Sequence, residues 1–155
     1  MKETILNINS YTLNSGLLIV GGSIDNHGTT STAEIFDPKS GRICKVADLP
    51  VTNRDLSVCG NIVCGGKWTP NSCFRLEVDG TFTTLPLTLT VERENHLCWD
   101  LPSGEILLLG GQKGRAPRTT DRVSADGSSS APDFDLPYTV QYIKTYILAF
   151  LIFDV

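Results

Sequence analysis

Three glycine pairs recur at nearly equal intervals along this chain of 155 residues, and each pair ends an apolar run. The runs with their glycines occupy residues 17–22, 62–66 and 106–111. The second glycine of each pair stands at position 22, 66 or 111, which gives spacings of 44 and 45 residues. A period of this length indicates a repeat architecture, in which each repeat is one small supersecondary unit.

Each repeat continues with the same order of elements. A polar loop follows the glycine pair, then come a strand, a tight turn that ends in glycine, another strand and a Leu-Pro pair. The turns occupy residues 37–41, 79–80 and 126–127. Proline presets φ for a turn, and glycine accepts the left-handed backbone conformation that closes it. These three segments therefore predict hairpins.

A further strand is expected before the glycine pair in the second and third repeats, over residues 54–59 and 93–99. Residues 60–61 and 102–104 supply the turns that follow these strands. Four short antiparallel strands per repeat are typical of one propeller blade. Apolar residues nowhere recur at helical spacing over three turns, so the predicted fold class is all-β.

At these positions the chain resembles kelch repeats, which belong to the galactose-oxidase-like superfamily of β-propellers. The resemblance rests on the apolar runs ending in glycine pairs, on residues 36–38 (Phe-Asp-Pro), and on Arg93 followed three positions later by His96. Ile43 and Phe82 stand where the family usually has tryptophan. The resemblance implies a partial kelch-type β-propeller of four-stranded antiparallel blades, with about two and a half to three blades in roughly residues 16–137.

The same resemblance divides the chain into segments. It implies a degenerate lead-in strand over residues 1–15, repeats over 16–53, 54–92 and 93–137, and a divergent apolar tail over 138–155. Six glycines are expected to be structural, because they let strands approach closely where a Cβ atom would clash. They are Gly21, Gly22, Gly65, Gly66, Gly110 and Gly111.

The tail contains an uncharged apolar run over residues 146–153, which has the composition of an aggregation-prone segment. The chain is therefore hypothesised to be a fragment or truncated product of a longer propeller. Two or three blades leave strand edges and apolar faces uncovered. Self-association of two chains would supply about five to six blades and close the ring.

The resemblance favours a non-catalytic role in protein–protein interaction, with an unknown protein partner bound by loops 23–32, 67–71 and 112–118. Seven candidate binding residues follow from this expectation. They are Arg54, Trp68, Arg93, His96, Lys113, Arg115 and Arg118.

Each candidate also has a structural interpretation. Arg54 and Arg93 are interpreted as equivalent positions of successive blades, which either line a shared surface or tie each blade to its neighbour through backbone carbonyls. The cations of residues 113–118 either form a solvated loop or bind an acidic peptide. Trp68 is either an exposed anchor or a cover for the blade edge. Trp99 is expected in the core.

An alternative is a degenerate fragment of a galactose-oxidase-like copper enzyme, or a truncated product with no function of its own. The copper site of that enzyme class needs two histidines, tyrosinate ligands and a cysteine linked to tyrosine. The chain has only His27 and His96, and its tyrosines cluster near its two ends. Copper demands a specific ligand set, so no catalytic residue, metal or cofactor is expected.

Charge and hydropathy limit the partners. The net charge of −4 and the isoelectric point near 5.1 argue against nucleic acid or an anionic membrane. The first residues lack the apolar core of a secretory signal, and the longest uncharged apolar run is far shorter than the roughly 20 residues of a membrane-spanning helix. The compartment stays open, with a slight preference for the cytoplasm.

Five cysteines are an odd number, and none of their spacings resembles a paired zinc-site motif. If residues 60–61 form a two-residue turn, Cys59 lies opposite Ile62 and Cys64 lies opposite Ser57. Cys59 and Cys64 then do not face each other. Buried free thiols in strands are expected, and disulfides in a secreted protein are the alternative.

Overall fold

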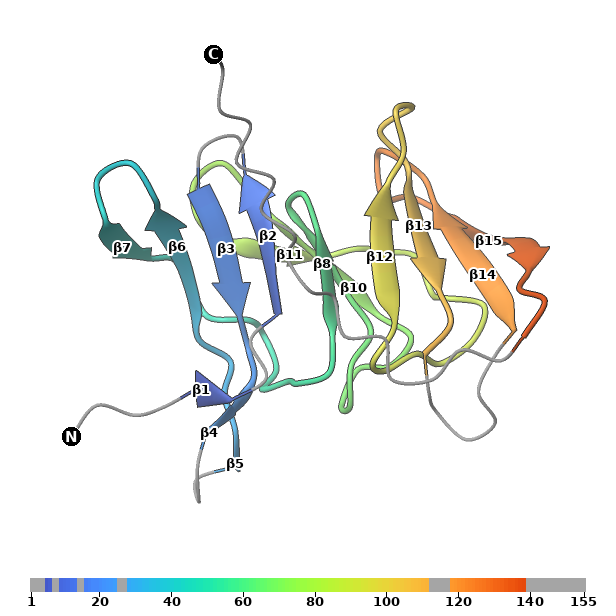
Figure 1. The fold of residues 1–155 in the computed structure, drawn as a ribbon, viewed down its shortest axis with the longest axis horizontal. Helices are drawn as coiled ribbons and strands as arrows, with labels where there is room; N and C mark the ends of the chain where they lie inside the picture. The colour runs from blue at the N-terminus through green and yellow to red at the C-terminus, as the bar shows by residue number, and fades with distance from the viewer. Residues whose placement is uncertain (1–4, 7–8, 14–15, 25–27, 112–117, 139–155) are drawn as a thin grey trace, which may run out of the picture.

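The computed structural model describes residues 5–6, 9–13, 16–24, 28–111 and 118–138. All regular secondary structure in these residues is β-strand, and every strand pairing is antiparallel (Figure 1). The predicted all-β fold class is confirmed. Within the described ranges there is no helix long and apolar enough to cross a membrane.

Three four-stranded sheets follow one another along the chain, and each pairs its strands in sequence order. The first sheet contains β2 (Asn9–Leu13), β3 (Gly16–Val20), β6 (Ala33–Asp37) and β7 (Arg42–Lys45). The second contains β8 (Ser57–Cys59), β9 (Ile62–Cys64), β10 (Cys73–Leu76) and β11 (Phe82–Thr84). The third contains β12 (Leu97–Asp100), β13 (Ile106–Leu109), β14 (Thr119–Val123) and β15 (Ser130–Asp135).

A smaller sheet is built from β1 (Ile5–Leu6), β4 (Ser23–Ile24) and β5 (Gly28–Thr29). Its β4 and β5 lie in the loop between β3 and β6. The first four-stranded sheet takes its strand β2 from residues 1–15, where a degenerate lead-in strand was expected. The strands expected over residues 54–59 and 93–99 begin later than predicted, at Ser57 and Leu97.

The three four-stranded sheets stand side by side in chain order, from left to right in Figure 1. One apolar cluster joins the first and second sheets, and another joins the second and third. The second sheet is therefore buried on both faces, with Val63 in one cluster and Ile62 in the other. Alternation of side chains along a strand places neighbouring residues on opposite faces, which is why one short strand serves two interfaces.

The first two glycine pairs contact the chain segment that leads into the next sheet. Gly22 N–H donates to the carbonyl oxygen of Asn53 (2.9 Å), and Gly66 N–H donates to that of Arg93 (2.8 Å). A Cβ atom on Gly21 or Gly65 would lie 2.5 Å from the same carbonyl oxygens. All six glycines of the pairs have positive φ. Positions 21 and 65 therefore require glycine, because both the space and the backbone conformation exclude a side chain.

The three hairpin turns share one hydrogen-bonding pattern, in which an aspartate side chain accepts from the backbone. Asp37, Asp79 and Asp126 each accept a hydrogen bond from the backbone N–H two residues later, at 2.9, 3.0 and 2.9 Å. Such bonds favour the ionised carboxylate. A backbone hydrogen bond from Ser128 and a hydroxyl hydrogen bond from Ser124 lower the pKa of Asp126 to about 2.

The expectation of buried free thiols holds for none of the five cysteines, since four form disulfides and the fifth is free but exposed. Cys64 forms a disulfide with Cys73, and Cys59 forms one with Cys98, with Cα atoms 4.2 and 5.8 Å apart. Cys64 does lie opposite Ser57, and Cys59 lies opposite Ile62, as the hairpin predicted. The bonding partners come from β10 and β12, which that hairpin does not include. Cys44 is free and exposed.

Trp99 was expected in the core, and the structure contradicts this. Its side chain is 61% exposed. Cys98 points toward the second sheet, where it forms the disulfide with Cys59. Trp99 follows it directly on β12, so it points to the opposite face of the third sheet.

Candidate interaction surface

The first two loops that follow glycine pairs meet at one end of the sheets in the described residues. Both β3 and β13 run toward the lower edge of Figure 1, where their loops begin. One hydrogen bond joins the first two loops, in which Trp68 Nε1 donates to Thr29 Oγ1 (3.4 Å). A second bond, from Arg54 Nη1 to Ser23 Oγ (3.2 Å), joins the first loop to the segment that precedes β8. The expected loops 23–32 and 67–71 therefore form one continuous surface in the described residues.

Trp68 is the most accessible apolar group of this surface, with 57% of its area exposed. A hydrogen bond fixes its backbone, because its N–H donates to Asn53 Oδ1 (3.2 Å). Asn53 Nδ2 also donates to Thr69 Oγ1 (2.7 Å) and to the carbonyl oxygen of Gly65 (2.9 Å). A fixed backbone under an exposed indole lowers the conformational entropy that a partner must remove on binding.

The cations of the loops differ in their surroundings. The Arg54 side chain is 37% exposed, and its Nε lies 3.5 Å from Asp55 Oδ2. Arg118 Nε donates to the carbonyl oxygen of Leu136 (2.9 Å). Lys113 and Arg115 lie outside the described residues. Of the third predicted loop, only Arg118 can therefore be placed.

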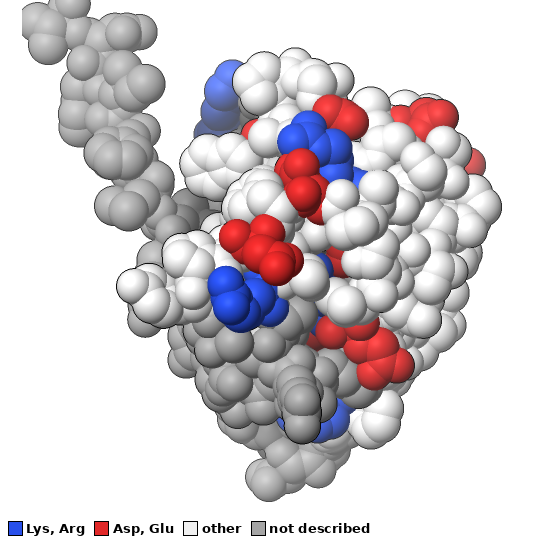
Figure 2. All heavy atoms as spheres, turned by 90° about the vertical axis from the view of Figure 1, so that its right-hand side faces the viewer, with Lys and Arg blue, Asp and Glu red and all other residues white. Residues whose placement is uncertain are grey.

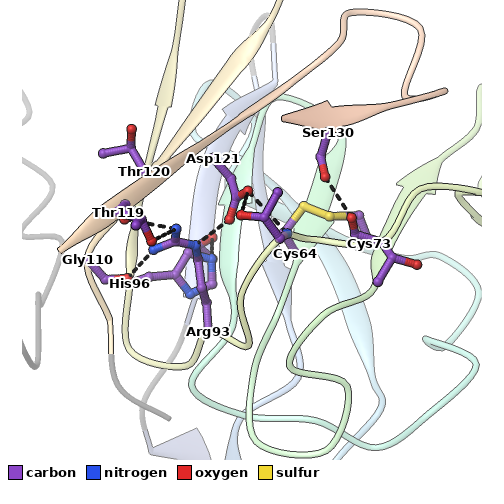
Figure 3. A network of polar contacts seen from close by, with 12 residues as sticks. Cys64, Cys73, Arg93, His96, Gly110, Thr119, Thr120, Asp121 and Ser130 are labelled. Atoms are coloured by element: carbon purple, nitrogen blue, oxygen red, sulfur yellow. Dashed lines mark hydrogen bonds and ion pairs between the residues drawn. A yellow bond between two sulfur atoms is a disulfide. The ribbon is translucent and has the colours of Figure 1, made fainter. Parts of the chain in front are cut away.

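Arg93 was a candidate for partner binding, but its side chain is fully buried. Its guanidinium donates from Nη1 to the carbonyl oxygen of Gly110 (2.7 Å) and from Nη2 to that of Thr119 (2.9 Å). Its Nε forms an ion pair with Asp121 Oδ2 at 2.8 Å (Figure 3). Thr90 donates a further hydrogen bond to Asp121 from its hydroxyl group. This network ties β13 and β14 to the segment that precedes β12, and it leaves Arg93 inaccessible to a partner.

The structure makes Asn53, and not Arg54, the counterpart of Arg93. The backbone carbonyl oxygen of each residue accepts a hydrogen bond from the N–H of the second glycine of the preceding pair. The side chain of each residue donates a hydrogen bond to the carbonyl oxygen of the first glycine of the following pair. Two residues later, Asp55 and Asn95 both have positive φ, of 59° and 52°. The predicted equivalence of the two arginines is therefore wrong by one residue.

His96 was also a candidate for binding, and it is 3% exposed. A hydrogen bond of 2.5 Å joins its Nε2 to Ser57 Oγ, which belongs to the second sheet. Burial, and then the positive charge of Arg93, lower the pKa of His96 to about 3. The imidazole is therefore neutral at physiological pH and belongs to the interface between the second and third sheets.

The buried imidazole makes stability depend on pH. The unfolded chain takes up a proton on His96 near pH 6.5, whereas the folded chain resists this until about pH 3. The contribution of neutral His96 to the free energy of unfolding is therefore fully present above pH 6.5. This contribution decreases by on the order of 1 kcal/mol for each unit that the pH falls below that value. We expect urea unfolding to show a smaller loss between pH 7 and pH 4 for His96→Gln than for the original chain. Equal losses in both proteins would contradict this role.

Within the described ranges, no group of three or more histidine, cysteine or acidic side chains is arranged to hold a metal ion. His27, one of the two histidines, lies outside those ranges. At this surface Trp68 offers an exposed aromatic face, and the partly exposed Ser23 and Thr29 offer hydroxyl groups. The chain matches no family model, and no curated protein gives a significant match to it.

Proposed function

We propose that the chain is part of a kelch-type β-propeller and that it binds a protein segment through the loop surface around Trp68, without catalysis. Three consecutive four-stranded antiparallel sheets support the propeller. The junction repeated at Asn53 and Arg93 supports it further, because the same backbone bond recurs between successive sheets.

The observation that carries the binding proposal is the exposed indole on a fixed backbone. Tryptophan is over-represented among residues that dominate binding energy at protein interfaces. Trp68 spans two loop regions through its bond to Thr29, so a partner that covers the ring contacts both. Arg54 and Ser23 add polar groups beside it.

A selection of random peptides displayed on phage, with the full chain immobilised, tests this proposal. Peptides enriched on the original chain are expected to bind Trp68→Ala about 30-fold more weakly or worse, which corresponds to a hot-spot contribution of ~2 kcal/mol. Trp99→Ala is the matched control, because Trp99 is similarly exposed but belongs to the third sheet. Peptides that bind Trp68→Ala as tightly as the original chain would contradict the proposal.

A further inference from the structure

Strand pairing aligns the second and third sheets position by position. Cys64 and Leu109 each precede a glycine pair, and each is paired across its sheet with Cys73 or Thr120. The same register aligns one row of side chains across each sheet. Cys59 of the second sheet corresponds to Trp99 of the third, Ile62 corresponds to Leu107, and Arg75 corresponds to Arg122.

In the second sheet, this row is the surface that holds the third sheet. Cys59 forms the disulfide with Cys98, and Arg75 Nη2 donates to the carbonyl oxygen of Ala125 (3.2 Å). Ile62 is buried in the apolar cluster that the two sheets share. All three residues therefore point toward the neighbouring sheet and contact it or share its core.

In the third sheet, the aligned row faces away from the second sheet. We call this side, with Leu97, Trp99, Leu107, Leu109 and Arg122, the outer face of the third sheet. Trp99 is 61% exposed. Arg122 is 40% exposed and forms ion pairs with Glu105 (3.1 Å) and Asp133 (2.7 Å) of its own repeat. Figure 2 shows this side of the molecule, where charged groups of both signs lie among uncharged side chains.

The first sheet carries the reciprocal surface. In the second sheet, Leu76 and Phe82 form a cross-strand pair that packs on the first sheet. The aligned pair in the first sheet is Phe36 and Ile43, on the side turned away from the second sheet. Ile43 is 60% exposed there. We call this side the outer face of the first sheet.

The chain thus bears at its two ends the two halves of the sheet-on-sheet interface that it forms twice internally. We infer that a second copy of this chain covers these faces, with the outer face of the first sheet of one copy packed on the outer face of the third sheet of the other. The contact is head to tail, and two such contacts close a ring of six four-stranded sheets. The inference does not depend on the loop surface around Trp68.

Sedimentation velocity of the full chain over a micromolar to submillimolar range tests the inference. The expected species is a dimer of twice 16.9 kDa. Trp99→Arg and Ile43→Arg, each on one outer face, are each expected to raise the dissociation constant at least tenfold and to give monomers. Trp68→Arg, on the loop surface, is the control and is expected to remain a dimer.

Mixing the two variants distinguishes a head-to-tail contact from other modes of association. Each variant retains one intact outer face, and the two retained faces are complementary, so the mixture is expected to form a heterodimer. Far-UV circular dichroism and the urea midpoint establish that both variants fold. A monomeric original chain, variants that still dimerise, or folded variants that do not associate when mixed would each overturn the inference.

Discussion

Replacing Arg93 with methionine is expected to lower the free energy of unfolding by about 3–5 kcal/mol, because it leaves a buried charge without its partner. Asp121 is fully buried, and the Arg93 guanidinium is the cation paired with it. The same substitution removes the hydrogen bonds to the carbonyl oxygens of Gly110 and Thr119. Methionine preserves much of the side-chain volume, so the loss measures the polar network more than a cavity.

The matched control is Arg122→Met, in which another arginine of the same repeat loses its ion pairs. Arg122 is 40% exposed, and exposed ion pairs contribute about 0–1 kcal/mol. Urea unfolding of the two variants is expected to differ by several-fold in the change of free energy. If Arg93→Met costs no more than Arg122→Met, the buried network does not hold β13 and β14 to the segment that precedes β12.

A double variant separates the ion pair from the surrounding packing. Combining Arg93→Met with Asp121→Leu removes both charges, so no buried charge is left unpaired. Its free energy of unfolding is expected to exceed that of Arg93→Met alone. A further loss in the double variant would indicate that the hydrogen bonds that Asp121 accepts from Thr90 stabilise the fold by more than the unpaired charge costs.

Local signals in the sequence sufficed for the fold class and for the turns. Hairpin turns are set by a few adjacent residues, and those at residues 37–41, 79–80 and 126–127 were predictable from proline, aspartate and glycine. The glycine pairs also mark the repeats, because a positive φ and a close backbone approach leave no alternative residue. The order of strands within each four-stranded sheet follows from these two features.

The site residues were harder to predict, because their roles depend on contacts between repeats. Arg54 was aligned with Arg93 by residue type, whereas backbone conformation aligns Asn53 with Arg93. Aligning Asp55 with Asn95 in the sequence would have corrected this error. Aspartate and asparagine tolerate the left-handed backbone conformation, and both residues adopt it. Asn53, which fixes the backbone of Trp68, was missed for the same reason.

The face on which Trp99 lies could not be inferred from its neighbours in sequence. A strand exposes alternate residues, and a shift of one residue exchanges the two faces. The disulfide of Cys98 with Cys59, and the strand pairing of Cys98 with buried Leu108, establish which face of β12 is internal. The disulfides could not be inferred for the same reason, because each joins one strand of the hairpin at residues 60–61 to a strand outside it.

Removing the Cys59–Cys98 disulfide is expected to destabilise the chain more than removing the Cys64–Cys73 disulfide. The two bonds close loops with sequence separations of 39 and 9 residues. The loss of loop entropy in the unfolded chain gives ~4 kcal/mol for the longer loop and ~2.5 kcal/mol for the shorter one. The paired variants Cys59→Ala/Cys98→Ala and Cys64→Ala/Cys73→Ala leave no new free thiol, so urea unfolding compares them directly.

The longer loop also joins two sheets, and this adds a second expected difference. Cys59 lies on β8 and Cys98 on β12, so their bond couples the second and third sheets, whereas Cys64 and Cys73 are paired within one sheet. Loss of the first bond is expected to broaden the unfolding transition, because the sheets then separate more independently. Cys44→Ala is the control and should change little, since Cys44 is free and exposed. A reductant should reproduce both losses together, and an original chain that is equally stable with and without reductant would contradict the role of both bonds.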